Sequence, residues 1–177
     1  MRIALHGIPG SGKSTLARLL VEEFIRSGRS VSLVRLADPL YQLQALVYRT
    51  AGRPLPDTTW QDGDLLAALA GHLRRINPDA LTADFRARVA QLPPDSAVVC
   101  DDLRAPDVPC LQELDFTLVH VKAQPLLRQA RRAARGDLTD GPEEALWALP
   151  AGAEVDNDGS VEELRAAARD LVRQVAP

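Results

Sequence analysis

The sequence predicts an α/β fold built on a parallel sheet, and three observations support this prediction. Apolar runs of strand length alternate with longer stretches that have helical periodicity. The first run, residues 3–5, leads through a glycine-rich turn into a helical stretch, and a second apolar run follows at residues 31–36. A strand–helix–strand order of this kind gives parallel strands joined by a right-handed crossover. At 177 residues, the chain is long enough for one domain with a substantial core.

The glycine-rich turn predicts a nucleotide-binding site. Residues 7–14 read GIPGSGKS, which matches the phosphate-binding pattern G-x-x-x-x-G-K-[ST]. Glycines let the backbone turn tightly around a polyphosphate, and the helix that follows adds its positive N-terminal end. A turn without a ligand is the alternative, and the strand–loop–helix order argues against it. Lys13 is expected to reach the β- and γ-phosphates of ATP, and the Ser14 hydroxyl to bind Mg²⁺. The phosphate-binding residues expected are Gly7, Gly10, Ser11, Gly12, Lys13, Ser14 and Thr15.

The stretch between the second and third strands predicts a helical insertion. A helix is expected over residues 13–27, before the second strand. Apolar residues at helical spacing then predict three helices in a row, at residues 39–51, 61–76 and 79–91, with a loop at 52–60. Three helices are more than a simple crossover requires. We therefore interpret residues 37–92 as an insertion that holds a second substrate.

Carboxylates follow the second and third strands. The third apolar run, residues 97–102, ends in Asp101 and Asp102. An aspartate at this place typically orders Mg²⁺ beside the loop serine, although it can instead cap a helix or stabilise a turn. The sequence does not decide which of the two serves the metal. Asp38 follows the second strand, at the sheet edge where open α/β folds bind ligands, and capping of the next helix is equally compatible with its position.

The C-terminal half is predicted to add two strands, at residues 116–121 and 153–156, and an arginine-rich helix. That helix, residues 122–135, places four arginines on one face: Arg128, Arg131, Arg132 and Arg135. A solvated basic face is the alternative, but phosphoryl transfer needs cations near the moving group. We therefore interpret residues 122–150, including a short helix at 142–149, as a lid. Ser160 and Glu163 are expected to form a capping box for the last helix.

The bulk composition excludes several classes of function. A net charge of −3 makes a general nucleic-acid coat a poor fit, and no run approaches the ~20 apolar residues of a membrane span. The two cysteines lack the spacing of zinc ligands and are expected to be buried free thiols. These features favour a cytoplasmic protein without a leader peptide, either a monomer or a homodimer. Packing is expected of His6. Trp60 is expected to anchor its loop, with stacking on a base as the alternative. His72 and His120 are expected to be isolated.

Several segments resemble those of the P-loop nucleoside monophosphate kinases, and most closely the phage-type deoxynucleoside monophosphate kinases. The segments are GIPGSGKST, LADPL at residues 36–40, Arg74-Arg75 before Asn77-Pro78-Asp79, DLRAP at residues 102–106 and DNDGS at residues 156–160. The chain departs from the family pattern at residues 69–72, where a Gln-x-x-Gly-Thr-Glu element is often seen, and at Val108, where a Glu is usual. The resemblance implies a three-layer P-loop NTPase sandwich whose five parallel strands lie in the order 2-3-1-4-5.

The resemblance also implies a reaction, in which ATP with Mg²⁺ phosphorylates a nucleoside or deoxynucleoside monophosphate. Arg74 or Arg75 would grip the acceptor phosphate, with Arg104 as a further candidate, while Asn157 and Gly159 would lie against the adenine. The arginines Arg128, Arg131 and Arg132 would close over the transferring group and exclude water. Asp38 would orient or deprotonate the acceptor, and this role matters more if the acceptor is a hydroxyl.

Three alternatives remain open at the level of sequence. The first is a P-loop kinase of another small metabolite, with a hydroxyl or a phosphate as acceptor. The second is a nucleotide-binding switch of the GTPase type, against which the missing Asn-Lys-x-Asp motif at residues 119–123 argues. The third is an inactive binding module.

Overall fold

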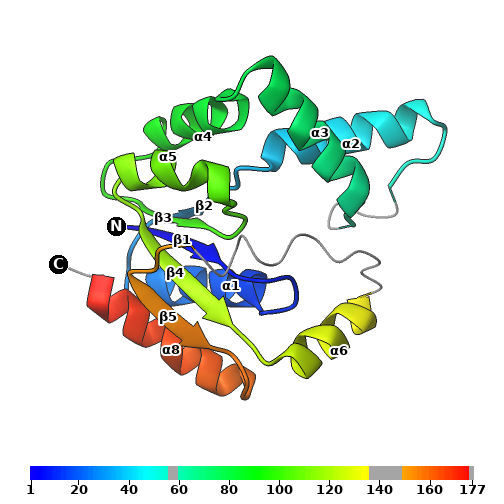
Figure 1. The fold of residues 1–177 in the computed structure, drawn as a ribbon. Helices are drawn as coiled ribbons and strands as arrows, with labels where there is room; N and C mark the ends of the chain where they lie inside the picture. Colours follow the sequence, from blue (N-terminus) through cyan, green and yellow to red (C-terminus); the bar gives the residue numbers. More distant parts are fainter. Residues whose placement is uncertain (56–59, 136–148, 176–177) are drawn as a thin grey trace.

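The computed structural model describes residues 1–55, 60–135 and 149–175. Five strands and the helices around them form three layers (Figure 1). In chain order the elements are β1 (Arg2–His6), α1 (Lys13–Arg26), β2 (Val31–Leu33), α2 (Asp38–Thr50), α3 (Gly63–Ile76), α4 (Ala80–Ala90), β3 (Ala97–Cys100), η1 (Ala105–Asp107), α5 (Val108–Glu113), β4 (Thr117–Lys122), α6 (Pro125–Arg135), β5 (Ala153–Asp156) and α8 (Val161–Val175).

The sheet is parallel throughout, and its strand order is β2-β3-β1-β4-β5, which confirms the predicted order. Ile3 of β1 stands opposite Val99 of β3 on one side and Thr117 of β4 on the other. Parallel strands end at the same edge, so the residues after β1, β2 and β3 meet there.

The two faces of the sheet bury different helices because side chains alternate along each strand. Ile3 and Leu5 of β1 pack in a cluster with Phe24 of α1 and Leu171 of α8. Ala4, between them, belongs to the opposite cluster, which contains residues of α4 and α5. Figure 1 shows α1 and α8 on one side of the sheet, with α2, α3, α4 and α5 on the other.

Three helices lie between β2 and β3, as the leucine spacing predicts. The insertion shares the core of the sheet, because Phe85 and Val89 of α4 are buried against it. Among the described residues, none of the helices is long and apolar enough to cross a membrane.

The two largest errors in the predicted boundaries are three residues each. Strand β2 stops at Leu33 instead of residue 36, because the backbone N–H groups of Leu36 and Ala37 donate to the Asp102 carboxylate and not to a neighbouring strand. Helix α6 begins at Pro125 instead of residue 122, because Lys122 still belongs to β4 and pairs with Asp156.

Other local predictions are confirmed. The Ser160 N–H donates to Glu163 Oε2 at 2.6 Å and the Glu163 N–H to Ser160 Oγ at 3.2 Å, which is a capping box. Cys100 and Cys110 are buried free thiols. The connection predicted at 136–141 and nearly all of the helix predicted at 142–149 lie outside the described residues.

Candidate nucleotide and acceptor site

The phosphate-binding loop joins β1 to α1, and three of its glycines have positive φ angles. The φ angles are 144° at Gly7, 85° at Gly10 and 99° at Gly12, in the region that side chains rarely adopt. A Cβ at Gly10 would lie 2.6 Å from the carbonyl oxygen of Arg128. A Cβ at Gly7 would collide with the Val121 carbonyl, and one at Gly12 with the Asn157 side chain. The glycines therefore allow both the turn and the close packing of β4, α6 and the β5–α8 turn.

Helix α1 begins directly after this loop, at Lys13. Among the described residues, no side chain caps this helix, so its first amides can donate to an anion. Lys13 Nζ donates to the carbonyl oxygens of Gly7 at 2.7 Å and Ile8 at 3.2 Å. The Ser14 side chain is exposed, Thr15 is half-buried and Ser11 is buried. The predicted phosphate-binding residues therefore converge on one helix N-terminus.

The turn after β5 is bonded directly to the loop. Asn157 Nδ2 donates to the Ser11 carbonyl oxygen at 2.8 Å, and Asn157 is 6% exposed. Arg131 Nη2 donates to the Asn157 carbonyl oxygen at 3.0 Å. Gly159 lies beside the capping box, where a Cβ would collide with the Glu163 carboxylate. Of the two residues predicted beside the adenine, Asn157 thus contacts the phosphate loop with its side chain.

Helix α6 brings part of the predicted arginine face to the loop. The backbone of Arg128 packs on Gly10, and Arg131 reaches Asn157. Arg128, Arg131 and Arg132 are half-buried. The side chain of Arg135, the fourth member of the predicted face, lies outside the described structure.

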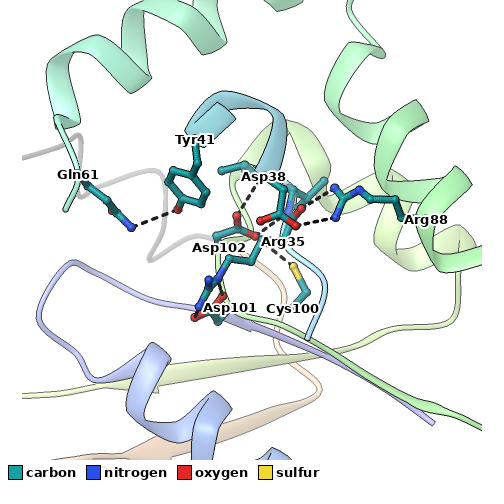
Figure 2. A network of polar contacts seen from close by, with 10 residues as sticks. Arg35, Asp38, Tyr41, Gln61, Arg88, Cys100, Asp101 and Asp102 are labelled. Carbon is teal, nitrogen blue, oxygen red and sulfur yellow. Dashed lines mark hydrogen bonds and ion pairs between the residues drawn. The ribbon is translucent and has the colours of Figure 1, made fainter. Parts of the chain in front are cut away.

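The carboxylates after β3 have different environments (Figure 2). Asp101 is 3% exposed at its side chain and accepts from Arg35 Nε at 2.8 Å. Asp102 accepts the Leu36 and Ala37 amides at 2.9 Å and 2.8 Å, one on each oxygen. Burial raises the pKa of Asp102, and these two amides oppose that rise. The hydrogen bond to Asp101 raises the pKa of Arg35.

Asp38 is the first residue of α2, and the preceding Ala37 is the cap residue. The capping role considered for Asp38 is therefore wrong. Its Oδ2 accepts from Arg88 Nη1 at 2.7 Å, and its side chain is 39% exposed. One turn further along α2, the Tyr41 hydroxyl accepts from Gln61 Nε2 at 3.3 Å. Burial, followed by the charge of Asp102, raises the pKa of Tyr41 to about 12.

The two adjacent arginines of α3 point to different places. Arg74 Nη2 donates to Asp107 Oδ1 at 3.0 Å, and Asp107 is buried. Oδ2 of the same carboxylate accepts the backbone N–H of Arg104 at 3.1 Å. Arg75 is exposed beside His72, and Arg104 is exposed after β3. The structure therefore separates Arg74 from Arg75, the two residues between which the sequence left the phosphate-binding role open.

Sequence reasoning missed Arg35, Tyr41 and Arg88. Arg35 sits between the second strand and Asp38, and its place at a strand end was the available signal. Tyr41 and Arg88 read as ordinary members of helices. Their positions beside Asp38 depend on how α2 and α4 pack.

The remaining side chains have packing roles. His6 and His120 are both buried and stack with ring centroids 4.7 Å apart, so the prediction that His120 is isolated is wrong. They meet because β1 and β4 pair at this register. Burial lowers the pKa of His120. Trp60 packs edge-on against Tyr48 at 5.3 Å, as expected of a loop anchor.

A cavity of about 500 Å³ lies between α2, α3 and α4. Its lining is mainly apolar, with Leu43, Leu46, Leu73 and Leu81 among its side chains. Asp84, which also binds Arg88, lies at its wall.

Solved structures of kinases share this fold. The APS kinase of Mycobacterium tuberculosis in complex with AMPPNP and APS superposes with a TM-score of 0.60 at 18% identity, covering 97% of this chain and 96% of that one. The shikimate kinase of Acinetobacter baumannii in complex with shikimate gives 0.55 at 14% identity, with 98% and 92% covered. A sugar kinase from Janibacter sp. gives 0.53 at 19% identity, with 99% and 95% covered.

Sequence comparison gives the family. No curated protein sequence matches the chain significantly. A family model described as an AAA domain matches residues 3–146, which is most of the chain. With the phosphate loop, the parallel sheet and this match together, the chain belongs to the AAA domain family of P-loop proteins.

Proposed function

We propose that this protein is an ATP-dependent kinase that phosphorylates a small metabolite. One observation carries the proposal. The loop that ends in Lys13, at the N-terminus of α1, lies at the same sheet edge as Asp38, Arg35 and Asp101. The phosphate-binding loop and the polar residues Asp38, Arg35 and Asp101, which we call the acceptor edge, therefore lie side by side at one end of the sheet. Within a single domain of residues 1–177, residues 37–92 would bind the acceptor and residues 122–150 would form the lid.

The donor half is assigned to the loop. Its amides and Lys13 would hold the ATP phosphates, with Arg128, Arg131 and Arg132 supplying further positive charge. Both Asp102 oxygens accept backbone amides, whereas both Asp101 oxygens accept from the Arg35 side chain, at 2.8 Å and 3.5 Å. A side chain can move aside more easily than the backbone, so Asp101 is the carboxylate that we pair with Ser14 for Mg²⁺. Bound Mg²⁺ would neutralise charge on the β- and γ-phosphate oxygens. Mg²⁺ commonly uses only one or two protein carboxylates beside substrate phosphates, which fits this donor set.

The acceptor half favours a hydroxyl. Asp38 presents a partly exposed carboxylate at the sheet edge, and Arg74 is engaged by Asp107. The acceptor oxygen would attack the γ-phosphorus as the bond from that phosphorus to the β,γ-bridging oxygen breaks. ADP would leave, and the hydroxyl proton would pass to Asp38. The likeness to kinases whose structures hold APS and shikimate supports a metabolite acceptor.

A nucleoside monophosphate is the second candidate. Arg104 is exposed near Tyr41, and Arg35 is a second cation there that is already paired with Asp101. Two cations beside the acceptor edge suit a phosphate group. This arrangement supports the acceptor that the sequence segments imply.

A panel assay tests the proposal. ATP and Mg²⁺ are incubated with nucleoside monophosphates, APS, shikimate and gluconate, and ADP release is followed. We expect acceptor-dependent ADP release that Lys13→Ala lowers on the order of a hundredfold or more. Phosphorylation of a hydroxyl metabolite alone supports the first candidate, and phosphorylation of monophosphates alone supports the second. ADP release that no acceptor raises above the Lys13→Ala background would refute the kinase proposal.

A further inference from the structure

Arg88 of α4 lies where the helical insertion meets the carboxyl end of β2. Its guanidinium donates to three residues, with Nη1 to Asp38 Oδ2 at 2.7 Å, Nη2 to the Arg35 carbonyl oxygen at 2.6 Å and Nε to Asp84 Oδ2 at 2.7 Å. Figure 2 shows Arg88 reaching toward Asp38 from the α4 side. A single side chain therefore connects α4 to α2 and to the connection between β2 and α2.

We propose that Arg88 is a positioning residue for phosphoryl transfer, and that it acts through Asp38. The inference rests on the proposed kinase function. Asp38 lies in the first turn of α2 with a 39% exposed side chain, so its carboxylate would otherwise sample several rotamers. The bond from Arg88 selects one of them. Small displacements of a reacting group can cost a hundredfold in rate, so fixing this carboxylate is a kinetic contribution.

The second bond extends the same effect to Arg35. Arg88 holds the Arg35 carbonyl oxygen, and the Arg35 guanidinium is in turn held by Asp101. Arg88 thus contacts both the Asp38 carboxylate and the backbone of Arg35. An arginine suits this task because its rigid planar fork directs donors from three nitrogens, whereas a lysine donates from a single rotatable ammonium group.

The core contacts of helix α4 come from residues other than Arg88. Leu81, Phe85 and Val89 are buried in the core, whereas the Arg88 side chain is 28% exposed. The same helix provides a matched control in Arg86, which pairs with Glu113 of α5 and not with the acceptor edge. Replacing either arginine removes one guanidinium from α4, and only one of the two replacements releases Asp38.

The test is a double-mutant cycle with the acceptor found in the panel assay. Arg88→Ala should lower kcat about 10- to 100-fold while the KM for ATP stays within about twofold. Arg86→Ala should leave both unchanged, and Arg88→Lys should restore little. The double variant Asp38→Asn with Arg88→Ala should be much closer in rate to Asp38→Asn alone than to the product of the two single losses, since only the bond to Arg35 remains to be lost. An unchanged kcat in Arg88→Ala, or multiplicative losses in the double variant, would overturn the inference.

A second measurement needs no acceptor. Hydrogen exchange at residues 35–41 should be faster in Arg88→Ala than in wild type, on the order of tenfold, and unchanged in Arg86→Ala. If wild type phosphorylates nothing in the panel, the proposed function fails while this readout still tests Arg88. Equal exchange at residues 35–41 in both variants would refute the positioning role by itself.

Discussion

The side-chain amide of Asn157 donates a 2.8 Å hydrogen bond to the carbonyl oxygen of Ser11, and the two residues are 146 positions apart. The bond attaches the β5–α8 turn to the middle of the phosphate-binding loop. Because the bond is buried, its loss leaves the Ser11 carbonyl without this donor. The shape of the loop therefore depends on a residue near the end of the chain.

Asn157→Ala is expected to weaken nucleotide binding. Loss of a buried hydrogen bond costs about 1 kcal/mol, which corresponds to a roughly fivefold higher Kd. Titration calorimetry with AMPPNP and Mg²⁺ measures this change. Asp170→Ala, on the exposed side of α8, serves as the control and should keep the wild-type Kd. An unchanged Kd in Asn157→Ala would show that the loop keeps its shape without this bond.

Arg74→Ala and Arg75→Ala should differ in stability although the two residues are neighbours. Arg74 pairs with the buried Asp107, so its removal leaves a buried carboxylate with one donor fewer. We expect a loss of about 1–3 kcal/mol in the free energy of unfolding. Arg75 is exposed, and its replacement should change stability by less than about 0.5 kcal/mol. Urea denaturation of the two variants checks this, and equal losses would contradict the assignment.

Asp101→Asn and Asp102→Asn should separate metal binding from structure. Asn at position 102 has one oxygen for two backbone amides, so we expect a loss of about 1–3 kcal/mol in stability. Asp101→Asn also weakens the buried pair with Arg35, so its stability should fall too, but this variant alone should raise the Mg²⁺ concentration needed for half-maximal kcat. Denaturant titration and Mg²⁺ titration of both variants are the measurements. A raised Mg²⁺ requirement in Asp102→Asn alone would exchange the two roles.

The stability of the protein should fall as the pH drops below about 6.5, in part because of His120. Burial lowers the pKa of His120 in the folded state, so the unfolded state binds protons more readily. The contribution is fully present above the unfolded pKa of about 6.5 and is lost as the pH falls toward the folded pKa. The change in unfolding free energy between pH 7.5 and pH 5.5 should be smaller in His120→Phe than in wild type. His72→Gln, at an exposed position, should keep the wild-type dependence.

The parts of the fold that the sequence predicts are those encoded by neighbouring residues. The phosphate-loop motif, the periodicity of α1 and the capping box of α8 are each visible within a few positions of the sequence, although the packing of the loop depends on distant residues. The end of β2 does not, because the Asp102 carboxylate that competes for its amides lies 66 positions from Leu36. Strand pairing likewise brings His6 to His120.

The acceptor edge was harder to predict for a related reason. Arg74 and Arg75 are chemically equal and adjacent, and only the buried Asp107 distinguishes them. Arg88 also has Asp84 four residues before it, which reads as an ordinary ion pair on a helix surface. The contact with Asp38 exists only because α4 packs beside the start of α2. Helix packing of this kind leaves no periodic signal in the sequence.

The three glycines of the phosphate-binding loop pack against residues from the C-terminal half of the chain. Each packs against a different group: Gly7 against the Val121 carbonyl, Gly10 against the Arg128 backbone and Gly12 against the Asn157 side chain. A fragment containing only the first strand, the loop and the first helix would include every residue of the motif but none of the groups that pack against its glycines. The conformation of the phosphate-binding loop is thus encoded in two distant parts of the sequence, because Val121, Arg128 and Asn157 pack against the glycines of the motif.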